Sequence, residues 1–169
     1  MKAMILAAGL GNRMRPLTLT TPKPLLAVGG KPLIVWHIDA LKAVGITELV
    51  INTAWLGHKL HEALGDGAAY GVNIQWSDEQ EPLETAGGIQ QALPLLGNEP
   101  FLLINGDIWL RYDFKRLINK DLGQQLAHLV LVNNPPQHPK GDFAFCKDQS
   151  NNLVLPEGEE KYTFAGVSV

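Results

Sequence analysis

The sequence predicts an α/β fold, a Rossmann-like and mostly parallel sheet with helices on both faces. Short apolar runs of strand length alternate with segments of helical periodicity over most of the chain. Several of these runs end directly at glycine or at polar residues. Because ligands of open α/β sheets lie beyond the carboxyl ends of the strands, these run ends are the expected place for a site.

The first half of the chain begins with an apolar run at residues 3–8, which we expect to form a buried strand. Residues 28–31 are predicted to form a turn. Pro32 suits the first position of a helix, and Gly45 is placed to end that helix. The other elements expected here are a strand at 48–52, a helix at 55–64 and a strand at 72–76.

The second half changes in character beyond Pro135 and Pro136, where short hairpin-like pieces replace the strand–helix alternation. Gly87 and Gly88 weaken a helix expected at 85–95. The other elements expected here are a strand at 101–105, a short helix from 113 to about 119, a strand at 126–132 and hairpin pieces at 142–146, 153–155 and 162–169.

Composition indicates one globular domain spanning residues 1–169. The formal net charge of -3 argues against a general nucleic-acid surface, and no apolar run approaches the ~20 residues of a membrane helix. A lone cysteine, Cys146, cannot form an intramolecular disulfide and is expected to be a buried, inert thiol. With a strand directly at the N-terminus, we expect a cytoplasmic protein without a signal peptide. The oligomeric state is left open.

A glycine-rich loop follows the first strand and carries cations. Gly9 and Gly11 allow a sharp turn and the close approach of backbone N–H groups to a ligand, while Arg13, Arg15 and Lys23 add positive charge. Two common phosphate-loop patterns do not fit, because Met14 stands at the third glycine of G-x-G-x-x-G and no Gly-Lys-Ser/Thr occurs. The loop is predicted to bind a polyphosphate.

Asp107 follows the apolar run at 101–105 and is expected at the same edge of the sheet as the glycine loop. A carboxylate facing a nucleoside triphosphate typically holds Mg²⁺, so Asp107 is the predicted metal ligand. His58 and His61 lie one helical turn apart, but the sequence supplies no third ligand at suitable spacing, and a solvated helix face is favoured for them. The four tryptophans are expected in the core or a pocket wall rather than in a nucleic-acid platform.

Residues 79–88 combine three glutamates with two glycines at an expected helix start. Glutamates are poor neighbours for phosphate, and the glycines permit close approach of a planar base. By themselves these residues favour an acidic loop with a helix cap over a base-binding segment.

The pattern L-A-A-G-x-G-x-R-M-x-P, followed by the Lys-Pro at residue 23, closely resembles the signature loop of the sugar-1-phosphate nucleotidyltransferases. Segments 79–88 and 103–109 resemble the same family, whose fold is the nucleotide-diphospho-sugar transferase fold. Segments 52–57, 81–88, 103–109, 127–132 and 140–143 resemble the members that act on N-acetylmuramate 1-phosphate in cell-wall (peptidoglycan) recycling. The resemblance implies that UMP passes from UTP to a sugar 1-phosphate with Mg²⁺ as cofactor.

The resemblance also implies residue roles. Arg13, Lys23 and Asp107 are the implied catalytic residues, with Asp107 as the metal ligand. Nucleotide binding is implied for Ala8, Gly9, Gly11, Asn12, Arg13, Lys23, Glu79, Gln80, Thr85 and Gly87. Sugar-phosphate binding is implied for Asn105, Gly141, Asp142 and Glu157. The expected division is therefore a nucleotide-binding part at about 1–110 and a sugar-binding part at about 111–169.

One departure from the family pattern is expected to matter. Family members carry a second metal carboxylate in a Trp-x-Asp-x-Gly segment, and none of the aspartates after Asp107 lies in such a context. We therefore expect a chain shortened at its C-terminus, either as a truncated product or as a variant with altered metal binding. Two alternatives to the N-acetylmuramate reaction stay open: a nucleotidyltransferase for glucose or mannose 1-phosphate, and a catalytically silent nucleotide-binding domain.

Overall fold

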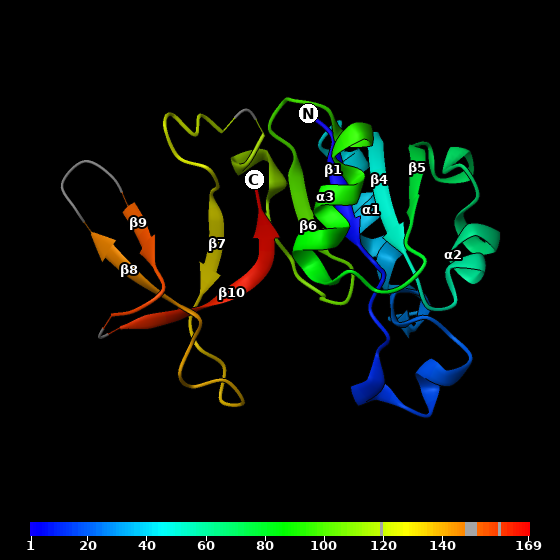
Figure 1. Cartoon of the computed structure of the whole chain (residues 1–169), viewed down its shortest axis with the longest axis horizontal. Coiled ribbons are helices and arrows are strands. Elements are labelled where there is room, and N and C mark those ends of the chain that lie inside the picture. The colour runs from blue at the N-terminus through cyan, green and yellow to red at the C-terminus, as the bar shows by residue number, and fades with distance from the viewer. Residues whose placement is uncertain (119, 148–151, 159) are drawn as a thin grey trace. The chain divides into compact units, whose positions relative to one another are not determined.

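The chain folds into two compact units, Met1–Lys120 and Asp121–Val169. Figure 1 shows the computed structural model, which describes residues 1–118, 120–147, 152–158 and 160–169, without the side chains of 145–147, 152 and 153. The predicted end of a short helix at Asn119 and the predicted burial of the Cys146 thiol lie outside these described residues and side chains.

The first unit is built on four parallel strands in the order β5-β4-β1-β6. Their bounds are β1 Ala3–Leu6, β4 Glu48–Thr53, β5 Asn73–Asp78 and β6 Leu102–Asn105. Leu6 is in register with Asn52 on one side and with Asn105 on the other, and Asn52 is in register with Ser77. The strands therefore end side by side, and the loops that follow them share one edge of the sheet.

Helices cover both faces of these strands, as the sequence predicts, with α3 in front of the sheet and α1 behind it in Figure 1. Their bounds are α1 Leu33–Ala43, α2 Gly57–Leu64 and α3 Glu84–Leu96. On the α3 face, Met4 and Val50 pack with Ala92 and Leu96 in one buried cluster. Ile5 and Ile51 point to the opposite face, because side chains alternate along a strand, and both are fully buried. The sheet is thus closed to water on both sides, which leaves its edges and strand ends for a ligand.

Short single turns complete the first unit. They are the 3-10 turns η1 Asn12–Met14, η2 Leu17–Leu19, η3 Lys23–Leu25, η4 Ala68–Tyr70 and η5 Phe114–Arg116, and the hairpin of β2 Ala27–Val28 with β3 Lys31–Pro32. The hairpin confirms the turn predicted at 28–31. The sequence did not predict η1, η2 or η3, which fold the long glycine loop. The helix expected from residue 55 begins at Gly57, because Leu56 adopts a left-handed backbone conformation with φ of 56°.

The second unit is antiparallel. Its strand β10 Lys161–Ser168 pairs with β7 Leu129–Val132 and with β8 Phe143–Lys147, and β8 also pairs with β9 Asn152–Leu155. The hairpin-like pieces expected after Pro135 are therefore strands of this unit. The strand expected from Leu126 begins three residues later, and the side chain of Leu126 is fully exposed.

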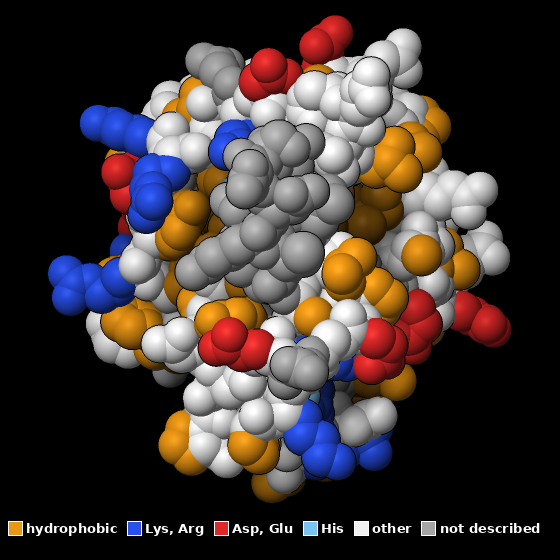
Figure 2. Space-filling model, turned by 90° about the vertical axis from the view of Figure 1, so that its left-hand side faces the viewer, with side chains coloured by type: hydrophobic (Ala, Val, Ile, Leu, Met, Phe, Trp, Pro, Cys, Tyr) orange, Lys and Arg blue, Asp and Glu red, His pale blue; other side chains and the backbone are white. Residues whose placement is uncertain are grey.

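Charged side chains of both signs are dispersed over the described part of the face seen in Figure 2. This mixture agrees with the formal net charge of -3. Within the described part of the chain, no helix combines the length and the apolarity that a membrane span requires.

Candidate active site

A cleft of about 500 Å³ lies at the carboxyl edge of the four parallel strands of the first unit. The sequence predicts a ligand site at this edge, and the cleft lies there. The cleft is lined by residues at the carboxyl ends of these strands and in the segments that follow them: Leu6, Ala7, Ala8, Gly9, Leu10, Gly11, Asn12, Arg13, Met14, Lys23, Pro24, Asn52, Glu79, Pro82, Glu84, Thr85, Asn105 and Asp107.

The glycine loop is held in shape from within. The backbone of Gly11 has φ of +63°, in the left-handed region, and its carbonyl oxygen accepts hydrogen bonds from the Met14 N–H at 2.9 Å and the Thr18 hydroxyl at 2.8 Å. A Cβ at position 11 would lie 2.8 Å from Thr18 Cγ2, so only glycine fits. Thr18 is buried, and it fixes the loop from behind while Arg13 stays exposed at the cleft.

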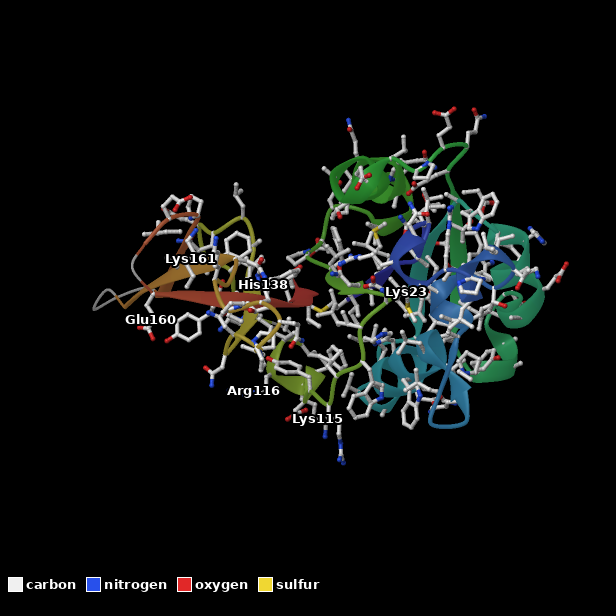
Figure 3. The ribbon with its side chains drawn as sticks, turned by 90° about the horizontal axis from the view of Figure 1, so that it is seen from below. Lys23, Lys115, Arg116, His138, Glu160 and Lys161 are labelled. Atoms are coloured by element: carbon white, nitrogen blue, oxygen red, sulfur yellow. The ribbon has the colours of Figure 1, made fainter. Side chains whose placement is uncertain are left out.

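Lys23 and Asp107 form the exposed pair of the cleft. Lys23 Nζ lies 2.7 Å from Asp107 Oδ2, with the two side chains 23% and 43% exposed. Lys23 comes from η3, and Figure 3 labels it within the first unit. Exposed ion pairs contribute about 0–1 kcal/mol to stability, because water screens both charges. This ion pair can therefore be broken at small cost. Lys23 is then free to pair with a phosphate, and Asp107 with a cation.

His37 supports the segment that carries Asp107. Its Nε2 lies 2.9 Å from the carbonyl oxygen of Ile108, and a carbonyl only accepts, so the Nε2 atom carries the proton. Burial lowers the pKa of His37, although the hydrogen bond to Ile108 and the nearby charge of Asp107 act in the opposite direction. A neutral imidazole therefore fixes the peptide group next to Asp107.

Asn52 and Glu79 form the buried pair of the cleft, on the other side of the glycine loop. Asn52 Nδ2 donates to Glu79 Oε1 at 2.7 Å, and the two residues are 2% and 6% exposed. Asn52 Oδ1 accepts from the Ala7 N–H at 2.8 Å, and Glu79 Oε2 accepts from the Leu83 N–H at 2.9 Å. Both ends of the buried pair are therefore engaged by backbone amides.

Residues 2–155 match the profile of the Nucleotidyl transferase family. The chain belongs to this family. It is 58% identical over its whole length to the N-acetylmuramate alpha-1-phosphate uridylyltransferase of Neisseria meningitidis, of which it spans 74%. It is also 43% identical, over 69% of its length, to a mannose-1-phosphate guanyltransferase of Saccharomyces cerevisiae, of which it spans 33%.

Solved structures agree on the fold. A structure from Bacillus anthracis, described as a glucose-1-phosphate thymidylyltransferase in complex with a sucrose, superposes with a TM-score of 0.85. The match covers 99% of this chain and 70% of that chain at 25% identity. The predicted nucleotide-diphospho-sugar transferase fold is thus confirmed.

Most residues that the sequence assigned to the nucleotide end come together in this nucleotidyl transferase. The cleft is lined by Ala8, Gly9, Gly11, Asn12, Arg13, Lys23, Glu79, Thr85 and Asp107. Asn105, which was assigned to the sugar phosphate, lines the same cleft. Gln80 and Gly87 do not line it. A Cβ at Gly87 would lie 2.7 Å from Leu83 Cβ, so close packing against Leu83 explains the glycine at this position.

The residues assigned to the sugar phosphate in the second unit are engaged locally. Asp142 accepts from His138 Nε2 at 2.9 Å and from the Phe164 N–H at 2.8 Å, and Glu157 lies 3.2 Å from Lys161 Nζ. His138 and Lys161 are labelled in Figure 3. The roles of Gly141, Asp142 and Glu157 toward a sugar stay predictions.

Two polar cleft residues, Asn52 and Glu84, were not assigned to the site from the sequence. Asn52 directly follows the apolar run 49–51 of β4, next to the first strand, and this polar residue near a strand end was a usable signal. Glu84 opens α3 with φ of 59°, a left-handed conformation that a glutamate rarely adopts and that no sequence pattern indicated. Glu84 thus presents a carboxylate at the cleft.

A divalent metal fits this cleft through Asp107. Mg²⁺ is commonly held by one or two carboxylates together with substrate phosphates and water, which suits one aspartate beside a phosphate loop. The described residues contain no group of three or more His, Cys, Asp or Glu side chains that could hold a metal by themselves. His61 stacks on Trp76 at 4.2 Å between ring centroids and lies 2.8 Å from Asp78 Oδ1, so it is engaged within the fold.

Proposed function

We propose that this nucleotidyl transferase moves UMP from UTP to N-acetylmuramate 1-phosphate, producing a UDP-sugar and pyrophosphate. The reaction belongs to peptidoglycan recycling in the cytoplasm. The observation that carries the proposal is a cleft with a glycine loop, Lys23 and Asp107, in a chain 58% identical over its whole length to an N-acetylmuramate alpha-1-phosphate uridylyltransferase.

The chemistry is an in-line displacement at phosphorus. A phosphate oxygen of the sugar 1-phosphate forms a bond to the α-phosphorus of UTP, and the bond from that phosphorus to the oxygen bridging to the β-phosphate breaks. Pyrophosphate leaves with that oxygen and its electron pair. A phosphate monoester is largely ionised at neutral pH, because its second pKa is about 6, so the attacking oxygen needs no general base. Alignment and charge neutralisation then do the catalysis.

The glycine loop and its cations do this work on the nucleotide side. Backbone N–H groups of residues 9–13 and the Arg13 guanidinium hold the β- and γ-phosphates and stabilise the departing pyrophosphate. Lys23 leaves Asp107 and turns to the α-phosphate, where negative charge develops. Asp107 would hold Mg²⁺, and the ion would supply charge neutralisation for the phosphates.

Fewer cleft residues are assigned to the sugar side. Asn105 lies in the cleft and ends the strand that leads to Asp107, so its amide suits a sugar or phosphate oxygen. Gly141, Asp142 and Glu157 are assigned to the sugar by resemblance. The lactyl ether of muramate adds a carboxylate, for which Lys140 is a candidate partner.

Pyrophosphate release tests the proposal. Purified protein is given UTP, GTP or dTTP with N-acetylmuramate, glucose or mannose 1-phosphate, in the presence of Mg²⁺. We expect the highest kcat/KM for UTP with N-acetylmuramate 1-phosphate. Equal or better turnover of glucose 1-phosphate would overturn the muramate assignment.

A second candidate, guanylyl transfer to mannose 1-phosphate, draws on the 43% identity to the yeast enzyme. Preferred use of GTP with mannose 1-phosphate in the same assay would establish it. Tight UTP binding by calorimetry without turnover of any pair would instead indicate a nucleotide-binding domain without catalysis.

A further inference from the structure

We propose that Asn52 and Glu79 are positioning residues, which couple the phosphate-binding loop to the loop expected to face the nucleobase. They would thereby hold the two ends of a bound nucleotide at one fixed separation. The inference rests on the proposed function for the identity of the nucleotide, and on the hydrogen bonds of the cleft for the coupling itself.

The connection is continuous from one loop to the other. It runs from the Ala7 N–H to Asn52 Oδ1, from Asn52 Nδ2 to Glu79 Oε1, and from the Leu83 N–H to Glu79 Oε2, over distances of 2.7 to 2.9 Å. Ala7 begins the glycine loop, and Leu83 immediately precedes α3. Two side chains thus link backbone segments that lie 76 residues apart in sequence, from 7 to 83.

Strand register brings these groups together. Leu6 is opposite Asn52, and Thr53 is opposite Asp78, so Ala7, Asn52 and Glu79 stand on three adjacent strand ends. The Glu79 N–H extends the ladder by donating to the Thr53 carbonyl at 2.8 Å. The register of the sheet therefore fixes the backbone positions of Asn52 and Glu79.

The space around the buried pair is closed by Gly88. A Cβ at that position would lie 2.6 Å from Glu79 Oε1 and 2.8 Å from Asn52 Nδ2. The first turn of α3 therefore approaches the pair as closely as a bare backbone allows. In this close packing, either loop can shift only by breaking a buried hydrogen bond, which is costly.

Burial separates this role from direct contact with the ligand. Both oxygens of Glu79 are engaged and only 6% of the residue is exposed, so its carboxylate is poorly placed to receive hydrogen bonds from a base. Glu84 and Thr85, which line the same cleft, are better placed for that purpose. Glu79 acts through the loop that it holds.

The chain provides a matched control at the other end of the same two strands. Asn73 Nδ2 donates to Glu48 Oε2 at 2.8 Å, and this pair is exposed. The residue types are those of the buried pair, with Glu on β4 and Asn on β5 instead of Asn on β4 and Glu after β5. This control pair lies at the amino ends of the two strands and away from the cleft.

The test exchanges donor and acceptor roles within the buried pair. Asn52→Asp places two carboxylates face to face, and Glu79→Gln leaves one amide donor pointing at another donor. In the double variant each bond is restored: the new carboxylate accepts from Ala7 and from the new amide, whose oxygen accepts from Leu83. Net charge is the same as in the wild type.

Each single variant is expected to lower kcat/KM for UTP about 10²-fold, chiefly through a higher KM for UTP, since a small misplacement at a site has that scale. The KM for the sugar phosphate should change far less. The double variant should recover to within about fivefold of wild type. Asn73→Asp and Glu48→Gln should leave both KM values unchanged.

Amide hydrogen exchange provides a readout that does not need turnover. We expect Glu79→Gln to speed exchange at Ala7 as well as at Leu83, and the double variant to restore protection at both. Faster exchange at Leu83 alone, with Ala7 unchanged, would overturn the coupling. Should a single variant not fold, a folded double variant with a wild-type KM for UTP supports the coupling, and a poor KM there overturns it.

Different results would refute the proposed function and the proposed coupling. A wild-type protein that does not turn over UTP refutes the proposed reaction, and the exchange pattern at Ala7 and Leu83 still decides the coupling. A wild type that turns over UTP, with single variants that match it in KM and in exchange, refutes the coupling alone.

Discussion

The acidic side chains on the two sides of the cleft differ in exposure and in the number of hydrogen bonds that they accept. On one side, Asp107 is 43% exposed and pairs with Lys23 through a single oxygen. On the other, Glu79 is 6% exposed and accepts two hydrogen bonds from fixed partners. The first carboxylate can change partners at little cost, whereas the second cannot. A site for charged substrates requires both kinds, one for the chemistry and the other for the shape.

This contrast predicts that substitutions in the exposed pair impair activity more than stability, and that substitutions in the buried pair reduce stability as well. The surface provides a control for the exposed pair. Lys31 and Asp39 form an ion pair of the same residue types, with side chains 30% and 49% exposed, and neither lines the cleft.

The largest effect is expected for Asp107→Asn, which keeps the shape and removes the charge. We expect turnover to fall about 10³-fold or more, because the proposed metal ligand is lost. The free energy of unfolding should change by less than about 1 kcal/mol. Pyrophosphate release at limiting Mg²⁺ and urea denaturation measure the two quantities. Asp39→Asn should keep wild-type turnover, and wild-type activity in Asp107→Asn would remove this residue from the metal site.

Arg13→Ala and Lys23→Ala come next, each with an expected loss of about 10²-fold in kcat/KM, the scale of losing one preorganised donor. Their unfolding curves should overlay the wild type, since these cations are partly exposed. Lys31→Ala serves as the control and should retain full activity. If either cleft variant has unchanged kinetics, that cation takes no part in catalysis.

Glu79→Ala tests the buried pair by its stability. It leaves the buried Asn52 Nδ2 and the part-buried Leu83 N–H without their acceptor, so we expect the free energy of unfolding to fall by about 2 kcal/mol. Glu48→Ala removes the exposed acceptor of Asn73 and should cost less than about 0.5 kcal/mol. Urea denaturation measures both variants. Equal denaturant midpoints for Glu79→Ala and Glu48→Ala would contradict the expected difference between the buried and the exposed pair.

The smallest effect concerns His37, behind the exposed pair. Its pKa is lowered from 6.5 by burial, so below pH 6.5 the unfolded chain takes up a proton more readily than the folded protein. The His37 contribution to stability is complete above pH 6.5 and is lost as pH falls toward the folded pKa, at no more than about 1.4 kcal/mol per pH unit.

His37→Gln should flatten this part of the pH dependence, because glutamine does not titrate. His58→Gln, at an exposed position, should leave the slope as it is. Urea unfolding at several pH values between 5 and 8 measures both variants. An unchanged slope in His37→Gln would show that this histidine does not supply it.

The sequence singled out Lys23 and Asp107 of the exposed pair and Glu79 of the buried pair, but it indicated neither Asn52 nor the contact within either pair, for a physical reason. Gly11, Lys23 and Asp107 stand beside apolar runs or in a recognisable loop, and parallel strands bring run ends to one edge. The hydrogen bond between Asn52 and Glu79 depends on the register of β4 against β5, which apolar patterns leave undetermined.

Backbone conformation was the other part that patterns did not reveal. The left-handed conformation of Leu56 delays the start of α2, and that of Glu84 opens α3. The turns η1, η2 and η3 depend on hydrogen bonds such as that from Thr18 to Gly11, which link residues without any periodic spacing. Hydrophobic periodicity predicts strands and helices, but it does not predict the conformation of such loops.

Gly88 has a consequence for how this sequence can change over time. Its missing side chain makes room for Asn52 and Glu79, and those two residues each require the other's hydrogen-bonding pattern. A lineage that alters any one of the three positions therefore passes through a weakened protein before a second change can repair it. We therefore expect the three positions to behave as an epistatic unit, in which a change at one position requires a compensating change at another.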